Sequence, residues 1–332
     1  MNKITVKLED IKAQTQKALV NHGASERVAE SVAEAVKVAE AENNKVCGLY
    51  YLESYCNQLK SNRVDGSVMP EVKKPSNSSV YVDAKNGFAQ PAFAAGFEMA
   101  VRTARENGIC LFTIAHSHTC TSMGFFTSQI AKKGLLGIGA TVAPACVSPP
   151  GGNKPLLGTN PISMSVPSKN NDVAFQFDQS TSAIAIGKIR MAASNGESIP
   201  EGWAVDKEGK PTTDPNKALE GSLLSSGGYK GFGFGLMAEL LASALTGSLS
   251  SVNAPPLKTT EGAPHDLGQT YIIIDPNFNG EKDHFFEQIN SLTELISSQP
   301  NARLPGSNKN NPSETEVDKD LWDSVNKLAE LD

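Results

Sequence analysis

The glycine run around Lys230 places the strongest constraint on how this chain can fold. The segment Gly227-Gly228-Tyr229-Lys230-Gly231 leads into an apolar stretch, Leu236 to Leu245, with the spacing of a helix. A lysine at the start of a helix is opposed by the helix dipole, and a bound anion would offset that charge. We therefore predict an anion site, such as a phosphate site, at Lys230. A solvated lysine in a flexible glycine loop is the alternative.

The same glycines do not support a Rossmann dinucleotide fold. Gly231-Phe232-Gly233-Phe234-Gly235 supplies Gly-x-Gly-x-Gly only, and it lies late in the chain rather than after the first strand. From about Ser79, short strand patterns alternate with helical ones, and several strands follow one another without a helix between them. Some strand pairs should therefore be antiparallel. We expect a non-Rossmann α/β fold with a mixed sheet.

The expected elements divide the chain into a helical N-terminal unit and an α/β body. The unit is residues 1–72, packed with the C-terminal helices within 281–332, and the body is residues 73–280. Helices are expected at 8–19, 26–42, 48–59, 92–107, 123–133, 182–193, 281–298 and 318–331. Strands are expected at 80–83, 109–114, 136–142, 162–166, 173–177 and 271–275.

Local signals mark one helix start and two long loops. Ser25 precedes the second helix and is a typical N-cap residue. The segments 195–215 and 248–268 are long and carry prolines, glycines or polar residues. Loops of that length in a compact protein are usually functional or mobile.

Composition and charge exclude several classes of protein. The formal net charge is −6 and there are no basic runs, which argues against nucleic acid and anionic membranes as partners. No segment reaches the roughly 18 apolar residues of a membrane span. The first seven residues lack the apolar region of a signal peptide. The five cysteines are irregularly spaced and odd in number, so we expect free thiols in the cytoplasm.

Two further segments have the composition of ligand-binding loops. Pro149–Pro161 contains four prolines and three glycines, which fix a loop whose backbone can approach a flat or charged ligand. Phe177–Ser182 places Asp178 beside three hydroxyl side chains at a strand end. A rigid turn is the alternative for the first segment, and a helix N-cap is the alternative for the second.

The segment His116–Gly124 is rich in polar side chains just past a strand. His116, His118 and Cys120 would share one face if the strand continued through them. Such a set could ligate zinc, but no fourth ligand is nearby and the spacing is not a standard zinc pattern, so we predict no metal. A catalytic or cofactor-facing histidine is favoured, and a polar turn is the alternative.

Together these segments resemble the type-2 malate/L-lactate dehydrogenase family of NAD(P)-dependent oxidoreductases, nearly end to end. The residues that carry the resemblance are Gly151-Gly152, Leu157–Pro161, Asp178, Thr181-Ser182, Gly187–Ile189, Ile199–Asp206, Pro211–Pro215 and Gly228–Gly231. The resemblance implies a non-Rossmann α/β body with a helical N-terminal unit, usually as a homodimer. It also implies hydride exchange at C2 of a small 2-oxo, 2-hydroxy or 2-imino acid.

The resemblance also implies two sets of site residues. The cofactor contacts would be Thr119, Gly158, Thr159, Asn160, Asp178, Gln179, Ser180 and Lys230. The polar groups around the substrate would be His118, Asp178, Cys47 and Tyr51. NADP(H) is the expected cofactor, and NAD(H) is the alternative.

The chain departs from the family pattern at the substrate site. Near residue 47 the family has Ser-His-Gly, two further residues and an arginine, whereas this chain has Val46-Cys47-Gly48-Leu49-Tyr50-Tyr51. Cys47 thus replaces the histidine that donates a proton, and Tyr51 replaces the arginine that holds the substrate carboxylate. A second family histidine aligns with Thr119, one place from His118.

These departures favour an imine over a ketone as the substrate. Reduction of a ketone needs a proton delivered to the developing alkoxide, and a positioned acid contributes roughly 10²–10⁴-fold. A cyclic imine can arrive already protonated. Asn86–Ala92 also resembles the imino-acid reductases of the family. We therefore expect a reductase of Δ1-piperideine-2-carboxylate or Δ1-pyrroline-2-carboxylate. The alternatives are a 2-hydroxy acid dehydrogenase and a cofactor-binding protein that has lost catalysis.

Overall fold

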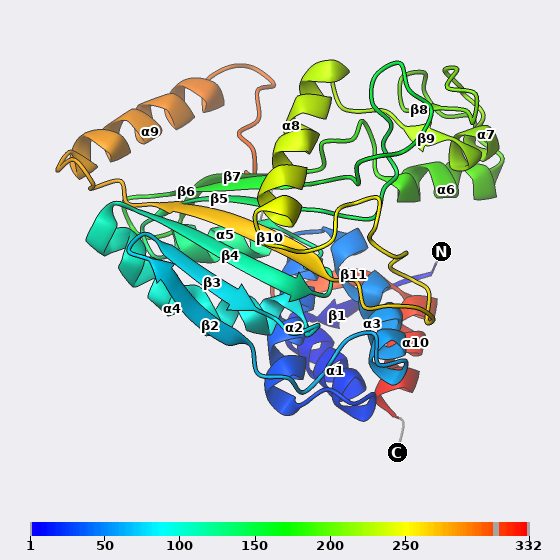
Figure 1. Cartoon of the computed structure of the whole chain (residues 1–332), viewed down its shortest axis with the longest axis horizontal. Coiled ribbons are helices and arrows are strands. Elements are labelled where there is room, and N and C mark those ends of the chain that lie inside the picture. The colour runs from blue at the N-terminus through cyan, green and yellow to red at the C-terminus, as the bar shows by residue number, and fades with distance from the viewer. Residues whose placement is uncertain (1, 308–311, 331–332) are drawn as a thin grey trace.

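A mixed seven-stranded sheet is the centre of the computed structural model, which describes residues 2–307 and 312–330 (Figure 1). Its strands are β2 (Glu71–Ser76), β3 (Ser79–Asp83), β4 (Ile109–Ser117), β10 (Leu267–Ile274), β5 (Leu136–Thr141), β6 (Ile162–Pro167) and β7 (Val173–Gln179), in that spatial order. Only β3 and β4 pair in parallel, and the other five pairs are antiparallel. The prediction of a mixed α/β fold with antiparallel pairs is therefore confirmed.

Two helices cover one face of this sheet. They are α4 (Ala89–Asn107) over β3 and β4, and α5 (Gly124–Ala131) over β5 to β7. Alternate strand residues face them, as the two-residue period of a strand requires. Phe93 of α4 lies 5.3 Å from Phe112 and 5.1 Å from Tyr271, ring centre to ring centre. This aromatic group forms the middle of the body's core.

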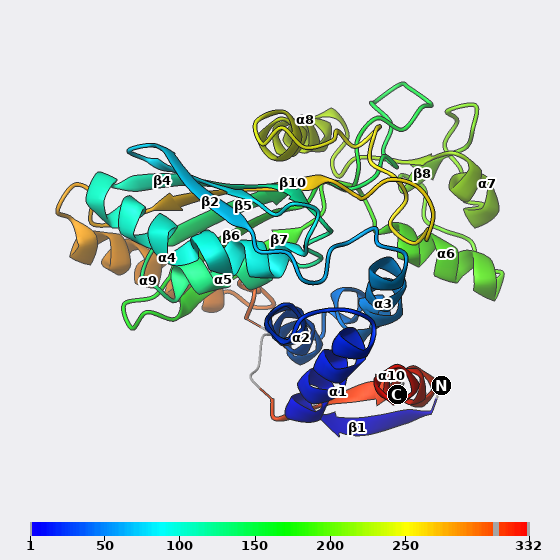
Figure 2. The ribbon, with the colours of Figure 1, turned by 60° about the horizontal axis from the view of Figure 1, so that its bottom comes forward.

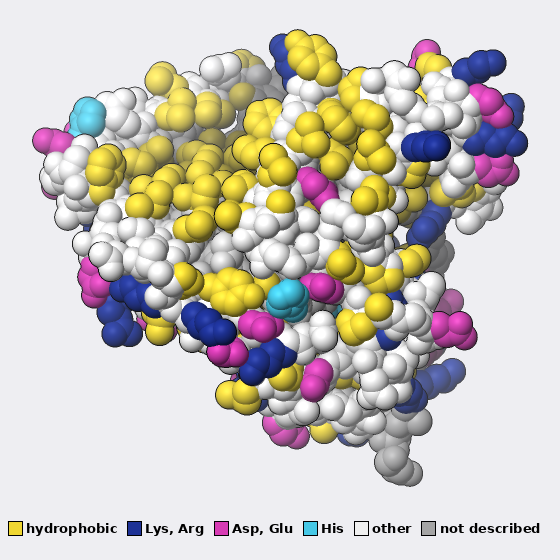
Figure 3. All heavy atoms as spheres, viewed as in Figure 1, with side chains coloured by type: hydrophobic (Ala, Val, Ile, Leu, Met, Phe, Trp, Pro, Cys, Tyr) yellow, Lys and Arg dark blue, Asp and Glu magenta, His cyan; other side chains and the backbone are white. Residues whose placement is uncertain are grey.

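The opposite face of the sheet is apolar and only partly covered. A cross-strand row runs through half-buried Leu111, Ile272, Ile138, Met164 and Phe177. The helix α8 (Tyr229–Glu239), its π-helical continuation (Leu240–Ala244) and the helix α9 (Lys282–Ser297) flank this row. Figure 3 shows hydrophobic side chains gathered between α8 and α9.

The N-terminal residues form a helical block below the sheet (Figure 2). Its elements are α1 (Leu8–Asn21), α2 (Glu26–Ala41), two 3-10 turns (Lys45–Cys47 and Leu49–Tyr51) and α3 (Leu52–Lys60). The block is closed by an antiparallel pair, β1 (Lys3–Lys7) with β11 (Glu314–Asp318), and by α10 (Lys319–Ala329), which packs on α1. Apolar side chains from both chain ends share one core.

A small lobe lies beside the sheet, where it packs with the segment between β5 and β6 and with the chain that follows β7. It contains α6 (Ile186–Asn195), β8 (Ala204–Val205), α7 (Pro215–Glu220) and β9 (Ser222–Leu223). Its own core centres on Val147, Leu157 and Ile189. The predicted loop 195–215 thus crosses this lobe and contributes β8 to it. No described helix is long and apolar enough to cross a membrane.

Three expectations about local structure need correction. Of the C-terminal helices, α10 packs on the N-terminal block, but α9 contacts β7 instead. Ser25 precedes α2, yet its hydroxyl makes no cap hydrogen bond. The strands β1, β2, β8, β9 and β11 were not expected, since each is short or largely polar. The expected end of the last helix, Leu331, lies outside the described residues.

The closest approach of α4 to the sheet gives a test of this packing. A Cβ atom on Gly96 would lie 2.6 Å from Val82 Cγ2 and 2.8 Å from Phe112 Cε2. We expect Gly96→Ala to lower the free energy of unfolding by roughly 1–3 kcal/mol, because overpacking forces buried atoms to shift. In the matched variant Gly233→Ala the Cβ meets no atom within 4 Å. That helix substitution should raise stability by roughly 0.5–1 kcal/mol. Denaturant unfolding of both variants measures the difference, and an unchanged Gly96→Ala would contradict the packing.

Candidate active site

Three of the predicted segments meet at the ends of β6 and β7. The amide of Thr181 donates to the carbonyl of Thr159 at 2.9 Å, and the amide of Ser226 donates to the carbonyl of Thr181 at 2.9 Å. The side-chain Nδ2 of Asn160 donates to the carbonyl of Gly235 in α8 at 3.2 Å. Residues far apart in sequence are therefore joined into one wall by backbone and side-chain hydrogen bonds.

Asn160 is the hub of this wall. It is fully buried, and its Nδ2 also donates to Glu239 Oε2 at 2.7 Å. Its Oδ1 accepts from the amide of Ala143 at 3.3 Å and lies 3.2 Å from Ser251 Oγ. Ser251 Oγ in turn donates to Glu239 Oε2 at 2.5 Å. Protein atoms occupy both ends of its side-chain amide, and its carbonyl accepts from Thr181 Oγ1 at 3.1 Å, so Asn160 fixes the loop.

Gly158 lies where two loops approach each other so closely that there is no room for a side chain. A Cβ on Gly158 would lie 2.1 Å from the carbonyl oxygen of Ala143. No larger residue fits there, so the loop that carries Thr159 can lie directly on the chain after β5. The proline- and glycine-rich segment is thus at least a tight structural turn, and its role toward a cofactor stays a prediction.

The start of α8 has the features of an anion site. Gly227 and Gly228 adopt φ of +66° and +67°. Glycine takes up this left-handed backbone conformation readily, whereas most other residues do not. The first backbone amides of a helix lack intrahelical acceptors. Lys230 lies in this first turn, is exposed, and forms no salt bridge with a described residue. These residues fit a dinucleotide phosphate, which the donors and the lysine would hold together.

Asp178 lies at the N-terminus of α5. Its Oδ2 accepts from the backbone amide of Gly124 at 2.8 Å and from Ser122 Oγ at 3.0 Å. The carboxylate therefore caps a helix other than the one that follows it in sequence. Its neighbours differ in exposure: Gln179 is exposed, while Ser180 is half-buried and donates to the carbonyl of Ser182 at 3.3 Å.

Cys47 and Tyr51 lie on the two 3-10 turns between α2 and α3, and Cys47 is close enough to Asp178 for its charge to act on the thiol. Burial and, to a smaller extent, the negative charge of Asp178 raise the pKa of the Cys47 thiol to about 12. Burial likewise raises the pKa of Tyr51 to about 12. Both groups stay protonated at neutral pH and are weak acids. The buried carboxylate of Glu40 holds these turns in place, because it accepts from the amide of Leu49 at 2.9 Å.

His118 lies beneath this surface rather than on it. Its side chain is 2% exposed and packs between Tyr55, Phe88 and His265, with a ring-centre distance of 4.4 Å to His265. Burial lowers the pKa of His118 well below its usual value, and the charges of His265 and Arg63 lower it further. His118 is thus neutral at pH 7. Thr119, the next residue, is half-buried.

The histidines of this segment do not converge on one point. His116 has φ of +55°, which breaks the alternation that was expected to place it beside His118. Its Nδ1 instead lies 2.8 Å from Asp266 Oδ1. In the described part of the chain, no group of three or more His, Cys, Asp or Glu side chains is placed to hold a metal ion.

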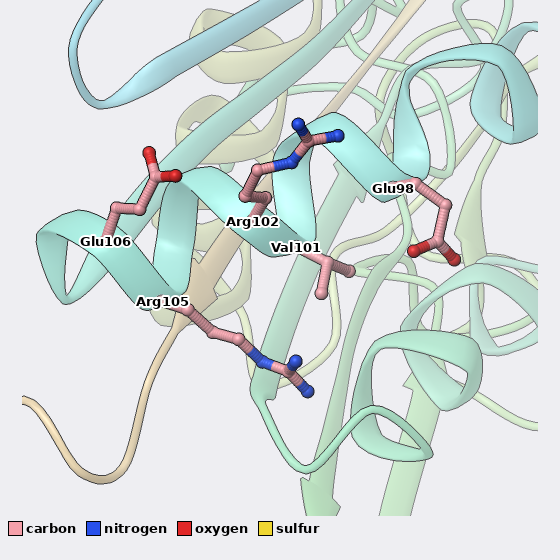
Figure 4. A pocket seen from close by; sticks show the side chains of 5 residues that line it. All are labelled: Glu98, Val101, Arg102, Arg105 and Glu106. Carbon is pink, nitrogen blue, oxygen red and sulfur yellow. The ribbon is translucent and has the colours of Figure 1, made fainter.

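A surface hollow of about 390 Å³ lies apart from these residues, on the outer side of α4 (Figure 4). It is lined by Glu98, Val101, Arg102, Arg105 and Glu106. Arg105 donates to the carbonyl of Lys133 at 3.0 Å. The hollow contains none of the predicted site residues, so the candidate site is defined by the loops described above.

Sequence patterns missed the residues that hold the site together. Glu239, Glu40 and Arg63 act through hydrogen bonds to distant segments, and single acids or bases in helices and turns give no pattern. Lys258 was not predicted either, although it lies within the loop 248–268, whose length is typical of functional or mobile loops.

Comparison with known proteins identifies the family. The malate/L-lactate dehydrogenase family model matches residues 6–324. A Δ1-pyrroline-2-carboxylate/Δ1-piperideine-2-carboxylate reductase of Pseudomonas putida is 36% identical over 91% of this chain and 89% of its own. A (2R)-3-sulfolactate dehydrogenase (NADP⁺) of Chromohalobacter salexigens is 37% identical over 85% of this chain and 83% of its own.

The structural comparison agrees with the sequence comparison. The crystal structure of Δ1-piperideine-2-carboxylate reductase from Pseudomonas syringae pv. tomato superposes with a TM-score of 0.90 and 31% identity, and the match covers 98% of this chain and 99% of that one. The resemblance inferred from the sequence is therefore confirmed. The chain belongs to the malate/L-lactate dehydrogenase family and is an NAD(P)-dependent oxidoreductase.

Proposed function

We propose that this protein reduces a small cyclic 2-imino acid, Δ1-piperideine-2-carboxylate or Δ1-pyrroline-2-carboxylate, to the L-amino acid. The observation that carries the proposal is the lack of a good proton donor among the candidate site's side chains. Cys47 and Tyr51 both have a pKa raised to about 12 by burial, and the pKa of His118 is lowered well below its usual value. None of the three is a good proton donor at neutral pH. Relatives that reduce such imines are similar over about nine tenths of the chain.

A cyclic imine suits this site because it brings its own proton. A protonated C=N carbon is electrophilic without a further acid, whereas a ketone oxygen must be protonated as it is reduced. Cys47 and Tyr51 would then shape the pocket and exclude water, and Asp178 would face the iminium with its negative charge. A nicotinamide cofactor, when bound, supplies the hydride.

The cofactor contacts proposed from the sequence follow the wall described above. Lys230 and the first amides of α8 would hold the diphosphate, and the backbone of Gly158, Thr159 and Asn160 would line the cofactor with Thr119. Asp178, Gln179 and Ser180 complete the set. We propose NADP(H) as the preferred cofactor and NAD(H) as the second choice. The NADP⁺-dependent sulfolactate relative and the exposed bases Lys188 and Arg190 on α6 support that order.

A 2-hydroxy acid dehydrogenase is the second candidate function. The sulfolactate dehydrogenase relative has an identity as high as that of the imine reductase, and this favours it. In that case His118 would have to replace the missing acid, which its burial opposes. A protein that binds the cofactor without turnover is the third candidate, motivated by the loss of the histidine and the arginine.

We further propose that the protein is a cytoplasmic homodimer. All five cysteines are unpaired, as is usual in a reducing compartment. The partly covered sheet face and the exposed apolar side chains of α8 and α9 form one surface of the kind that a second copy covers (Figure 3). Phe234, Leu240 and Leu295 on this surface are each more than half exposed.

A substrate panel tests the reaction. Oxidation of NADPH and NADH is followed with both cyclic imines and with pyruvate, oxaloacetate and other 2-oxo acids. We expect kcat/KM to be roughly 10² or more higher for an imine than for the oxo acids, the value of a positioned acid. The rate should fall as rising pH deprotonates the iminium. Turnover of oxo acids alone would reverse the ranking, and cofactor binding without any turnover would favour the third candidate.

Restoring the family residue at position 47 tests the acid argument. We expect Cys47→His to shift the ratio of kcat/KM toward 2-oxo acids by roughly tenfold or more, because the imidazole can deliver a proton near neutral pH. Cys47→Ala removes the thiol without adding an acid and should not shift that ratio. An equal ratio in all three proteins would mean that proton donation does not decide the substrate class.

The dimer is tested by charging its proposed interface. Leu240→Asp and Leu295→Asp place a carboxylate on exposed positions of the π-helical continuation of α8 and of α9, so they should convert the dimer to monomer without unfolding it. Met69→Asp is the control, since Met69 is 65% exposed but lies in the segment next to α2. Light scattering after size-exclusion chromatography measures the mass. A monomeric wild-type protein would refute the proposal.

A further inference from the structure

The loop 248–268 is fastened to the N-terminal block by one buried arginine. Arg63 is 2% exposed, and its Nε donates to the carbonyl of Ala263 at 3.0 Å. Its Nη1 donates to the carbonyl of Thr259 and, at 3.0 Å, to the Thr259 hydroxyl. Gln58 of α3 donates to the same Thr259 carbonyl at 2.7 Å. A guanidinium that binds loop carbonyls gives a long loop a defined path beside α3 (Figure 1).

This path brings Lys258 to the residues that line the candidate site. Its Nζ lies 2.8 Å from the Tyr50 hydroxyl and 4.1 Å from the centre of the Tyr50 ring. The same Nζ is 5.9 Å from the centre of the Tyr51 ring. Tyr51 stacks on Tyr55 at 5.9 Å, and Tyr55 contacts His118. The ammonium group therefore lies beside Tyr51, at the exposed end of a row of rings that continues to the buried Tyr55 and His118.

The charge of Lys258 has no negative partner of its own. The side chain is exposed, and it forms no salt bridge with a carboxylate of the described residues. An ammonium group that is positioned by a hydroxyl and two rings keeps two donor directions free for an anion. A small 2-imino or 2-oxo acid presents one carboxylate at neutral pH, and Tyr51 offers it no positive charge.

We propose that Lys258 binds the substrate carboxylate, and that Arg63 positions it by holding the loop. The proposal rests on the proposed function, because it assumes an acid substrate between Cys47, Tyr51 and Asp178. Arg190 on α6 is the competing cation. It acts electrostatically on Tyr51, but no described side chain fixes its position. Lys258 has a defined position on the Tyr50–Tyr51 pair, which favours it.

Ligand binding, rather than turnover, tests Lys258. Calorimetric titration of the NADPH-loaded protein compares pyrrole-2-carboxylate, a planar mimic of the imine, with its neutral carboxamide. We expect Lys258→Met to weaken the carboxylate by roughly 10–100-fold and the carboxamide by less than about threefold, the range of a lost charged hydrogen bond. Lys258→Arg should retain most of the affinity. Lys282→Met is the matched control, since that ammonium lies 5.6 Å from the Phe286 ring on α9.

The outcomes separate this proposal from the proposed reaction. A selective loss for the carboxylate, with no imine turnover by the wild type, would support Lys258 and overturn the reaction. Equal losses for both ligands would overturn Lys258 as a carboxylate contact, because they indicate a role in loop structure alone. A selective loss in Arg190→Met with none in Lys258→Met would assign the carboxylate to α6 instead. Weaker NADPH binding by Lys258→Met would place the ammonium on the cofactor and also overturn the proposal.

Discussion

The pairing of β10 between β4 and β5 is the constraint on which the rest of the structure depends. Without this strand, two central strands would each leave a row of buried amides and carbonyls unpaired, which is costly. β10 comes from residues 267–274, which follow all the other strands of the seven-stranded sheet in sequence. Its pairing therefore also fixes the chain before it, namely α8 and the loop 248–268. Both of these segments face the candidate site.

The candidate site is built from polar contacts between segments that are distant in sequence. Asn160, Glu239 and Ser251 form one buried network that joins the loop before β6, the helix α8 and the long loop after it. Glu40 plays a similar role in the N-terminal block, where it holds the turns that carry Cys47 and Tyr51. Such networks rigidify a site only when every member is satisfied. The catalytic surface is thus shaped by residues that do not face the substrate.

The chemistry of the site follows from its low polarity. Burial makes Cys47 and Tyr51 poor acids and keeps His118 neutral, so the uncharged forms of these side chains are favoured in the candidate site. In the proposed site, Asp178 would face the iminium, whereas Lys230 and Lys258 would face the anionic groups of the cofactor and the substrate. This arrangement separates the positions that can hold an anion from the position where a protonated carbon–nitrogen bond would lie.

The sequence by itself determined the α/β class, most of the long elements and the family, because hydrophobic periods and glycine-rich motifs are local. It also indicated that 158–160, 178–180 and Lys230 belong to one site. Only the tertiary structure decided how they are held. Asp178 caps α5 rather than the helix that follows it in sequence, and His118 is buried against His265. The helix α9 contacts β7 rather than the N-terminal block. These contacts join segments that are distant in sequence and come together only when β10 pairs between β4 and β5. Local sequence patterns do not specify such long-range contacts.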